Sequence, residues 1–76
     1  MLLVGDKVRI TSVPSDCTDP VEAGLQCVIE SARLTLDGVR YFLSYYGDSP
    51  SLSVHFFVYN DWTDDQLSAV QERYIP

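Results

Sequence analysis

The chain has 76 residues, and its eleven Asp and Glu against five Lys and Arg give a formal net charge of −6 at pH 7. This length predicts one domain, residues 1–76, that buries only about 60% of the surface its unfolded chain exposes. Phosphate backbones and anionic membrane surfaces are bound by concentrated positive patches, so the charge argues against nucleic acid and membranes as partners.

Cysteine and histidine are scarce in this chain, which has Cys17, Cys27 and His55. A structural zinc site uses four such ligands, so no metal is expected. Residues 1–4 are apolar but far too few for a signal peptide or a membrane span. We therefore expect a cytoplasmic protein with two reduced, at least partly buried thiols.

The first predicted strand lies in residues 4–11 and opens after Gly5-Asp6, where polar residues alternate with Val8 and Ile10. The next thirteen residues, 12–24, are rich in Ser, Asp, Pro and Gly. They predict a long acidic surface loop. A loop of this length in so small a domain is unusual and is commonly functional or flexible.

A β-hairpin is predicted next. Residues 25–35 alone would also suit a helix, but Asp37-Gly38 is a tight-turn signal. Residues 39–46 that follow are rich in strand formers. Strand, turn and strand is the economical interpretation of the whole segment.

A second turn is predicted at residues 47–51 and a fourth strand at residues 52–59. Thr63, with Gln66 three residues on, matches a capping box and predicts a helical turn starting at Asp64. Beyond it, either a helix or a single 3₁₀ turn and a short edge strand fits the sequence.

These elements predict a mainly all-β fold, a small five-stranded antiparallel barrel with a long first loop and a short helical turn near the C-terminus. The layout resembles SH3-like barrels, the group that includes KOW-type domains, nitrile hydratase β-subunit barrels and type II plasmid dihydrofolate reductases. The resemblance is carried by Val4-Gly5-Asp6-Lys7-Val8-Arg9-Ile10, Gly24-x-x-Cys27-x-Ile29 and Asp61-Trp62-x-x-Asp65-x-Leu67. It implies that residues 12–24 are the RT loop and that a 3₁₀ turn precedes the last strand.

Two relatives of this group suggest functions. Peptide-binding SH3 domains share an acidic RT loop and a Trp placed like Trp62, but their aromatic ALYDY-type motif is absent here. Type II reductases are homo-oligomers that bind cofactor and substrate at a central pore through a Val-Gln-Ile-Tyr stretch. At the similar place, His55 stands for that Gln and Phe57 for that Tyr. An anionic cofactor also suits an acidic chain poorly, so no cofactor is expected.

Strict alternation assigns faces to the second predicted hairpin. Leu52, Val54, Phe56 and Val58 are expected to face inward, together with Val39, Tyr41, Leu43 and Tyr45. The outer face would then carry a candidate binding surface of two Phe, two Tyr, an Arg and a His: Arg40, Phe42, Tyr46, His55, Phe57 and Tyr59. Such a composition is enriched at protein interfaces. The C-terminal segment could instead fold back over it.

We therefore expect a non-catalytic protein-interaction or self-association module whose partner is another copy or a different protein. No nucleophile has a recognisable base beside it, so no catalytic residue is assigned. Two alternatives stay open. One is a homo-oligomeric enzyme of the type II reductase kind, with a site on its symmetry axis, and the other is a peptide-binding SH3-type domain.

Overall fold

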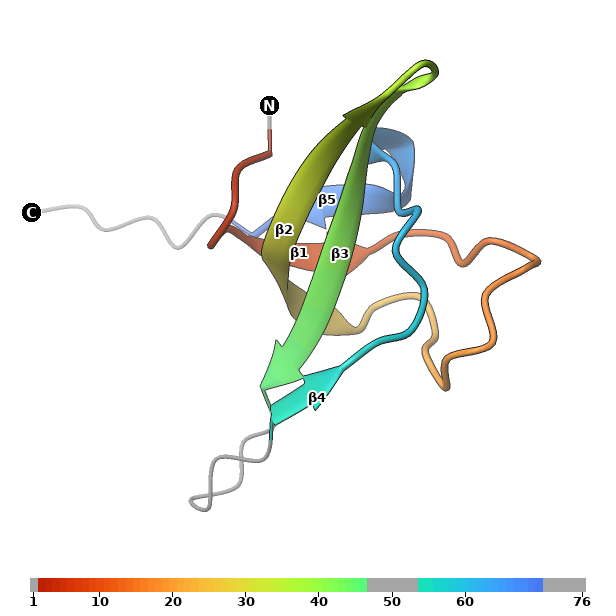
Figure 1. Ribbon diagram of the computed structural model, residues 1–76. Coiled ribbons are helices and arrows are strands. Elements are labelled where there is room, and N and C mark those ends of the chain that lie inside the picture. Colours follow the sequence, from red (N-terminus) through yellow and green to blue (C-terminus); the bar gives the residue numbers. More distant parts are fainter. Residues whose placement is uncertain (1, 47–53, 71–76) are drawn as a thin grey trace, which may run out of the picture.

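Five strands and one 3₁₀ turn make up the computed structural model, which describes residues 2–46 and 54–70, with the backbone alone for Tyr46 and residues 54–56. The elements are β1 (Lys7–Ile10), β2 (Gln26–Thr35), β3 (Gly38–Tyr46), β4 (Val54–Phe56), η1 (Asp64–Gln66) and β5 (Leu67–Ala69). They form one antiparallel sheet in the order β4-β3-β2-β1-β5 (Figure 1). The expectation of a mainly β fold is confirmed.

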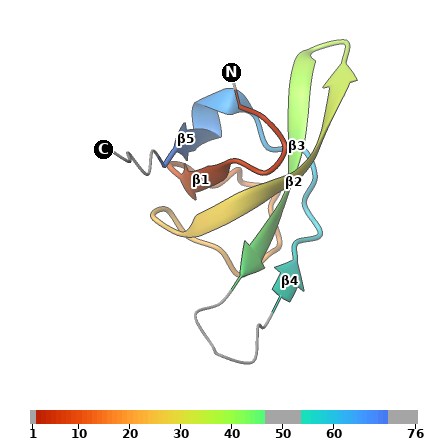
Figure 2. The ribbon, with the colours of Figure 1, turned by 90° about the vertical axis from the view of Figure 1, so that its left-hand side faces the viewer.

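The sheet is strongly twisted and open. Figures 1 and 2 show the long β2–β3 pair running across β1 and β5 at a steep angle. Within the described residues, β4 and β5 are the two edges and do not pair with each other. The predicted strands are therefore present, whereas closure into a barrel is not seen in this part of the chain.

Strand β1 begins at a glycine turn and alternates as predicted. Gly5 adopts a φ of 93°, and the backbone N–H of Asp6 donates to the Leu3 carbonyl at 3.0 Å. Positive φ is readily accessible to glycine alone, which places the turn here. Val8 and Ile10 are fully buried, whereas Lys7 and Arg9 are exposed.

The β2–β3 hairpin turns at Asp37-Gly38, as the sequence predicts. Gly38 has a φ of 117°. The Thr35 hydroxyl donates to the Gly38 carbonyl at 2.7 Å and accepts from the Asp37 N–H at 3.2 Å. The ladder extends from Thr35↔Gly38 to Val28↔Ser44. This ladder excludes the helical alternative for residues 26–35.

A β-bulge interrupts the ladder between Ile29 and Ser31. The residue inside it, Glu30, accepts a hydrogen bond from the Ser44 hydroxyl at 2.8 Å. Ser44 is fully buried, although strict alternation along residues 39–46 would place it on the outer face with Arg40 and Phe42; that expectation is wrong. Burial of its hydroxyl is tolerated because the hydrogen bond replaces its lost hydration.

The core gathers on the concave side of the twisted sheet. It consists of residues from four strands together with two aromatic residues that follow β4: Val8, Ile10, Cys27, Ile29, Tyr41, Leu43, Phe57, Trp62 and Leu67. Trp62 joins it by returning to β3, where Tyr41 and Trp62 exchange backbone hydrogen bonds of 2.8 and 3.3 Å. The inward direction predicted for Tyr41 and Leu43 is confirmed.

The alternation predicted for residues 52–59 is wrong at its end. Phe57 is only 4% exposed, whereas Val58 is 79% exposed. The Phe57 N–H still donates to the Leu43 carbonyl at 3.4 Å, and the chain then leaves β3 until Trp62. Burying the aromatic ring removes more apolar surface from water than burying a valine would. Leu52, Ser53 and the turn at 47–51 lie outside the described residues.

The Asp19 carboxylate holds the chain where it leaves β3. Its two oxygens accept from the backbone N–H groups of Val58 at 3.0 Å and Tyr59 at 2.8 Å. Asp19 belongs to the long loop between β1 and β2, which lies on the same side of the sheet as this segment in Figure 1. Cys17 and Val21 of the same loop pack against the core. The loop is thus docked on the domain through side chains as well as through its two ends.

The capping box produces one turn of 3₁₀ helix. The Gln66 side chain accepts from the Thr63 N–H at 3.1 Å, and η1 spans Asp64–Gln66. Strand β5 follows at once and pairs with β1, from Val8↔Ala69 to Ile10↔Leu67. The strand alternative is therefore confirmed for residues 67–69.

Phe57→Ala is expected to lower the free energy of unfolding by about 3–5 kcal/mol, because it empties a core position. Val58→Ala, its matched neighbour, should change it by about 0.5 kcal/mol or less, because that side chain is in water. Urea denaturation followed by Trp62 fluorescence measures both. Equal losses, or a larger loss for Val58→Ala, would contradict the direction assigned to these residues.

Asp19→Asn is expected to destabilise the protein by about 1–3 kcal/mol, because an amide cannot accept two N–H bonds with both of its terminal atoms. Glu22→Gln in the same loop removes the same charge from an exposed side chain and serves as the control. Hydrogen exchange at the Val58 and Tyr59 amides reports the local effect. If both variants exchange there at the same rate, Asp19 does not hold the segment.

Candidate functional site

Two of the six predicted binding residues line a hollow of about 280 Å³ on the face of β2–β3 away from the core. Arg40 and Phe42 are half-buried there. The full lining is Ser31, Arg33, Arg40, Phe42 and Asn60, and these five residues are the Arg33–Arg40 hollow from here on.

Phe57 and Tyr59 do not join this hollow. Phe57 is a core residue on the opposite side of the sheet from Phe42, so its predicted outward direction is wrong. Tyr59 is half-buried, with its ring edge-on to Trp62 at a centroid distance of 5.3 Å. In the β3–β4 ladder Tyr46 pairs with Val54, and His55 pairs with Tyr45. For Tyr46 and His55 the structure describes the backbone alone.

The register of the β2–β3 hairpin explains why Arg33 and Ser31, which were not predicted as binding residues, line the hollow. Arg33 lies directly across the ladder from Arg40, and Ser31 lies directly across from Phe42. Paired residues in a sheet share one face. The Asp37-Gly38 turn was predicted, and counting back from it would have paired Arg33 with Arg40. Asn60 had no such signal, because it arrives from the irregular segment after β4.

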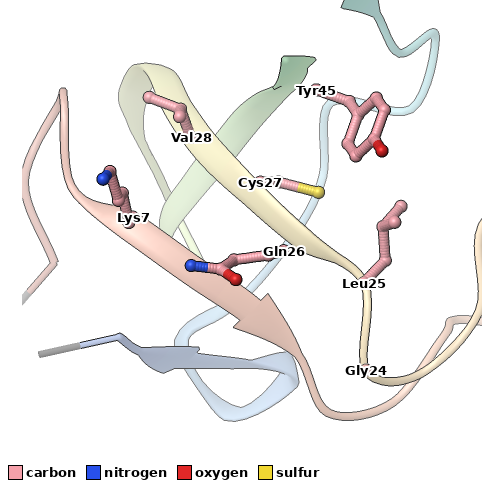
Figure 3. A pocket seen from close by; sticks show the side chains of 7 residues that line it. All are labelled: Lys7, Gly24, Leu25, Gln26, Cys27, Val28 and Tyr45. Atoms are coloured by element: carbon pink, nitrogen blue, oxygen red, sulfur yellow. The ribbon is translucent and has the colours of Figure 1, made fainter. Parts of the chain in front are cut away.

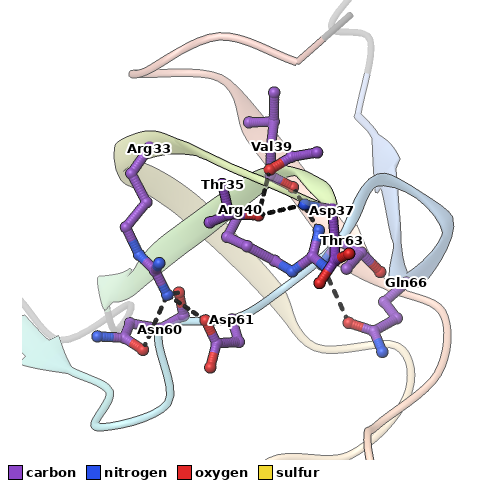
Figure 4. A network of polar contacts seen from close by, with 10 residues as sticks. Arg33, Thr35, Asp37, Val39, Arg40, Asn60, Asp61, Thr63 and Gln66 are labelled. Carbon is purple, nitrogen blue, oxygen red and sulfur yellow. Dashed lines mark hydrogen bonds and ion pairs between the residues drawn. The ribbon is translucent and has the colours of Figure 1, made fainter.

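Asn60 and Asp61 are held beside the hairpin by Arg33. The Arg33 Nη2 donates to the Asn60 carbonyl at 3.1 Å and to its Oδ1 at 3.5 Å, and it forms an ion pair with Asp61 (Figure 4). Both partners of the ion pair are about half exposed, so it contributes little to stability. Its main effect is to fix where the segment after β4 crosses the hairpin.

Arg40 has a simpler arrangement. Its Nη1 donates to the carbonyl of the preceding residue, Val39, at 3.2 Å. In Figure 4 its side chain extends away from Arg33, toward Thr63 and Gln66. The side chains of Arg33 and Arg40 both line the hollow, but the Arg40 guanidinium is turned away from Arg33.

The tip of the same hairpin exposes apolar side chains. Leu34 is 82% exposed and Leu36 is fully exposed. Figures 1 and 2 show this end of β2–β3 projecting beyond the rest of the sheet. We call residues 34–39 the hairpin tip.

A second hollow, of about 400 Å³, lies over the β1–β2 pair (Figure 3). Its lining is Lys7, Gly24, Leu25, Gln26, Cys27, Val28 and Tyr45. In Figure 3 the Cys27 sulfur points toward the side occupied by Leu25 and Tyr45. Burial raises the pKa of the Cys27 thiol to about 11, so the thiol is protonated at neutral pH and is a poor nucleophile.

Other shifted groups have structural explanations. Burial, and then the Asp64 carboxylate that accepts from the Tyr41 hydroxyl at 2.8 Å, raises the pKa of Tyr41 to about 12. Burial and the Asp16 carboxylate raise the pKa of Tyr59. Across residues 2–46 and 54–70 no three His, Cys, Asp or Glu side chains gather as a metal site would need.

Trp62 is fully buried, and its indole N–H has no hydrogen-bond partner within the described part of the chain. Polyproline segments dock on aromatic side chains that line a groove at the surface. The Trp62 ring does not line a surface groove here. It packs in the core and against the edge of the Tyr59 ring.

Comparisons with protein-family models, with curated proteins and with solved structures found no match to this chain.

The raised pKa of Cys27 predicts a loss of stability at high pH. Below pH 9 the thiol is protonated in both the folded and the unfolded chain. Between pH 9 and 11 it ionises mainly in the unfolded chain, which lowers the free energy of unfolding by on the order of 1 kcal/mol at pH 10. Urea titrations at pH 8, 9 and 10 should show this slope in wild type and Cys17→Ala and a smaller one in Cys27→Ala, where the raised pKa values of Tyr41 and Tyr59 remain. An unchanged slope in Cys27→Ala would contradict the assignment.

Proposed function

We propose that this chain is a small non-catalytic protein-interaction module whose contact element is the β2–β3 hairpin. The hairpin tip carries the proposal, because it holds Leu34 and Leu36 in water on an ordered element. The Thr35 hydroxyl binds the backbone of Asp37 and Gly38 across the turn and fixes its shape. Burying each leucine against a partner would contribute about 2 kcal/mol, and rigidity lowers the entropy cost of doing so.

Polar groups lie next to these leucines on the same hairpin. The Arg33–Arg40 hollow begins one ladder pair below Leu34 and Val39. Apolar contacts beside arginines that remain hydrated are typical of protein interfaces, where arginine is enriched. The hairpin thus combines exposed apolar side chains, whose burial would provide affinity, with arginines that would orient a partner.

We further propose that the domain is an SH3-like barrel variant. The order of its elements supports this: a first strand, a long loop, a β-hairpin, and a 3₁₀ turn before a last strand that pairs with the first. Because Trp62 is buried, the hairpin is favoured over a polyproline groove as the contact surface.

The acidic surface agrees with a protein partner. The net charge of −6 gives phosphate backbones little to bind. No helix in the described ranges is long and apolar enough to cross a membrane. The partner in this proposal is either a second copy of the chain or another protein.

Photo-crosslinking in the native host tests the proposal. With benzoylphenylalanine at position 36, we expect a crosslinked product that is absent when the probe replaces exposed Ser12 and is lost when Leu34 is also changed to Asp. Light scattering of the purified chain then tells a second copy from another protein. If position 36 gives no more product than position 12, the hairpin tip is not a contact surface.

A further inference from the structure

We infer that the Arg33–Arg40 hollow binds a carboxylate, supplied by an acidic side chain of the protein partner. This inference rests on the proposed function and names the chemistry of the partner. It follows from the kinds of polar atom that line the hollow, from the hydrogen bonds they already make, and from the charge they leave uncompensated.

The polar groups of the hollow are mainly unused donors. Arginine has five N–H donors and no acceptor. Within the described residues, Arg33 donates its hydrogen bonds from Nη2 alone, and Arg40 donates one from Nη1. Among the described residues, the remaining guanidinium N–H groups have no protein partner. The Asn60 side-chain oxygen already accepts from Arg33, which leaves its NH₂ group to donate.

Charge points to the same ligand. Arg33 and Arg40 lie directly opposite each other, and like charges at opposed positions destabilise a sheet. Asp61 pairs with Arg33 but is not part of the lining. Arg40 has no ion-pair partner in the described part of the chain, so one positive charge in the hollow is uncompensated.

A ligand can recruit Arg40 at low cost. Its only hydrogen bond in the described structure goes to the adjacent carbonyl of Val39. Turning the guanidinium toward the hollow would therefore break no contact between distant parts of the chain. Arg33 is already held in place from the side of Asn60 and Asp61 (Figure 4).

A carboxylate fits better than a phosphate. A planar carboxylate matches a single guanidinium fork and carries one charge. A doubly charged phosphate would be repelled by Asp61 beside the hollow and by the net charge of −6. Leu36, which is fully exposed in the turn next to this end of the hollow, further predicts that the acidic residue stands beside an apolar one.

Titration of the purified ¹⁵N-labelled chain with short peptides tests the inference. The probes are acetyl-LEEL-amide, its neutral match acetyl-LQQL-amide, and inorganic phosphate. We expect acetyl-LEEL-amide to shift the Nε–Hε signals of Arg33 and Arg40 and the amides of Ser31 and Phe42 in a saturable way. Arg40→Gln should weaken this binding about tenfold, and Arg40→Lys should weaken it less.

Arg9→Gln is the matched control, because it removes the same charge from an exposed residue of β1. It should leave the binding of acetyl-LEEL-amide unchanged. The inference is overturned if acetyl-LQQL-amide binds equally well, if phosphate binds more tightly than acetyl-LEEL-amide, or if Arg9→Gln weakens binding as much as Arg40→Gln.

The two proposals can fail separately. Crosslinking through position 36 with no response to acetyl-LEEL-amide would keep the interaction module and remove the carboxylate site. A saturable, Arg40-dependent response without crosslinking would keep the carboxylate site and remove the hairpin tip as a contact surface.

Discussion

The rest of the structure depends on the antiparallel pairing of β2 with β3. This ladder carries the buried Ile29, Tyr41 and Leu43, which make much of the core, and β1 and β4 pair onto its two sides. It also extends past the core, and the turn hydrogen bonds of Thr35 hold its far end while Leu34 and Leu36 remain in water. One element therefore both stabilises the domain and presents side chains that the domain does not need.

Irregular segments complete the fold through a few long-range bonds. Asp19 binds two consecutive amides that lie 39 and 40 residues further along the chain. Arg33 binds the segment around Asn60 from the opposite face. Between them these two side chains fix residues 58–61, which have no strand neighbours of their own. The acidic loop thus has a structural task in addition to its contribution to solubility.

The sequence predicted those elements whose position depends on neighbouring residues alone. Alternation identified β1, the Asp37-Gly38 turn set the hairpin, and the capping box at Thr63 set η1. It failed at Phe57 and Val58, because tertiary bonds to Asp19 end the strand there and no local pattern records them. Of the candidate surface, Arg40 and Phe42 share a hollow. Ser31 and Arg33 also line this hollow, because strand register places them opposite Phe42 and Arg40. Asn60 completes the lining, and only the folded chain brings it near.

Within residues 2–46 and 54–70, the two edge strands, β4 and β5, are each three residues long. An open sheet offers unpaired backbone groups to any extended chain, and long flat edges are the usual route to aggregation. Three residues provide too few hydrogen bonds for a foreign strand to be held firmly, so this small domain can leave its sheet unclosed at little risk. Its associations would then be selected by side chains on one hairpin and not by the sequence-blind hydrogen bonding of an exposed backbone.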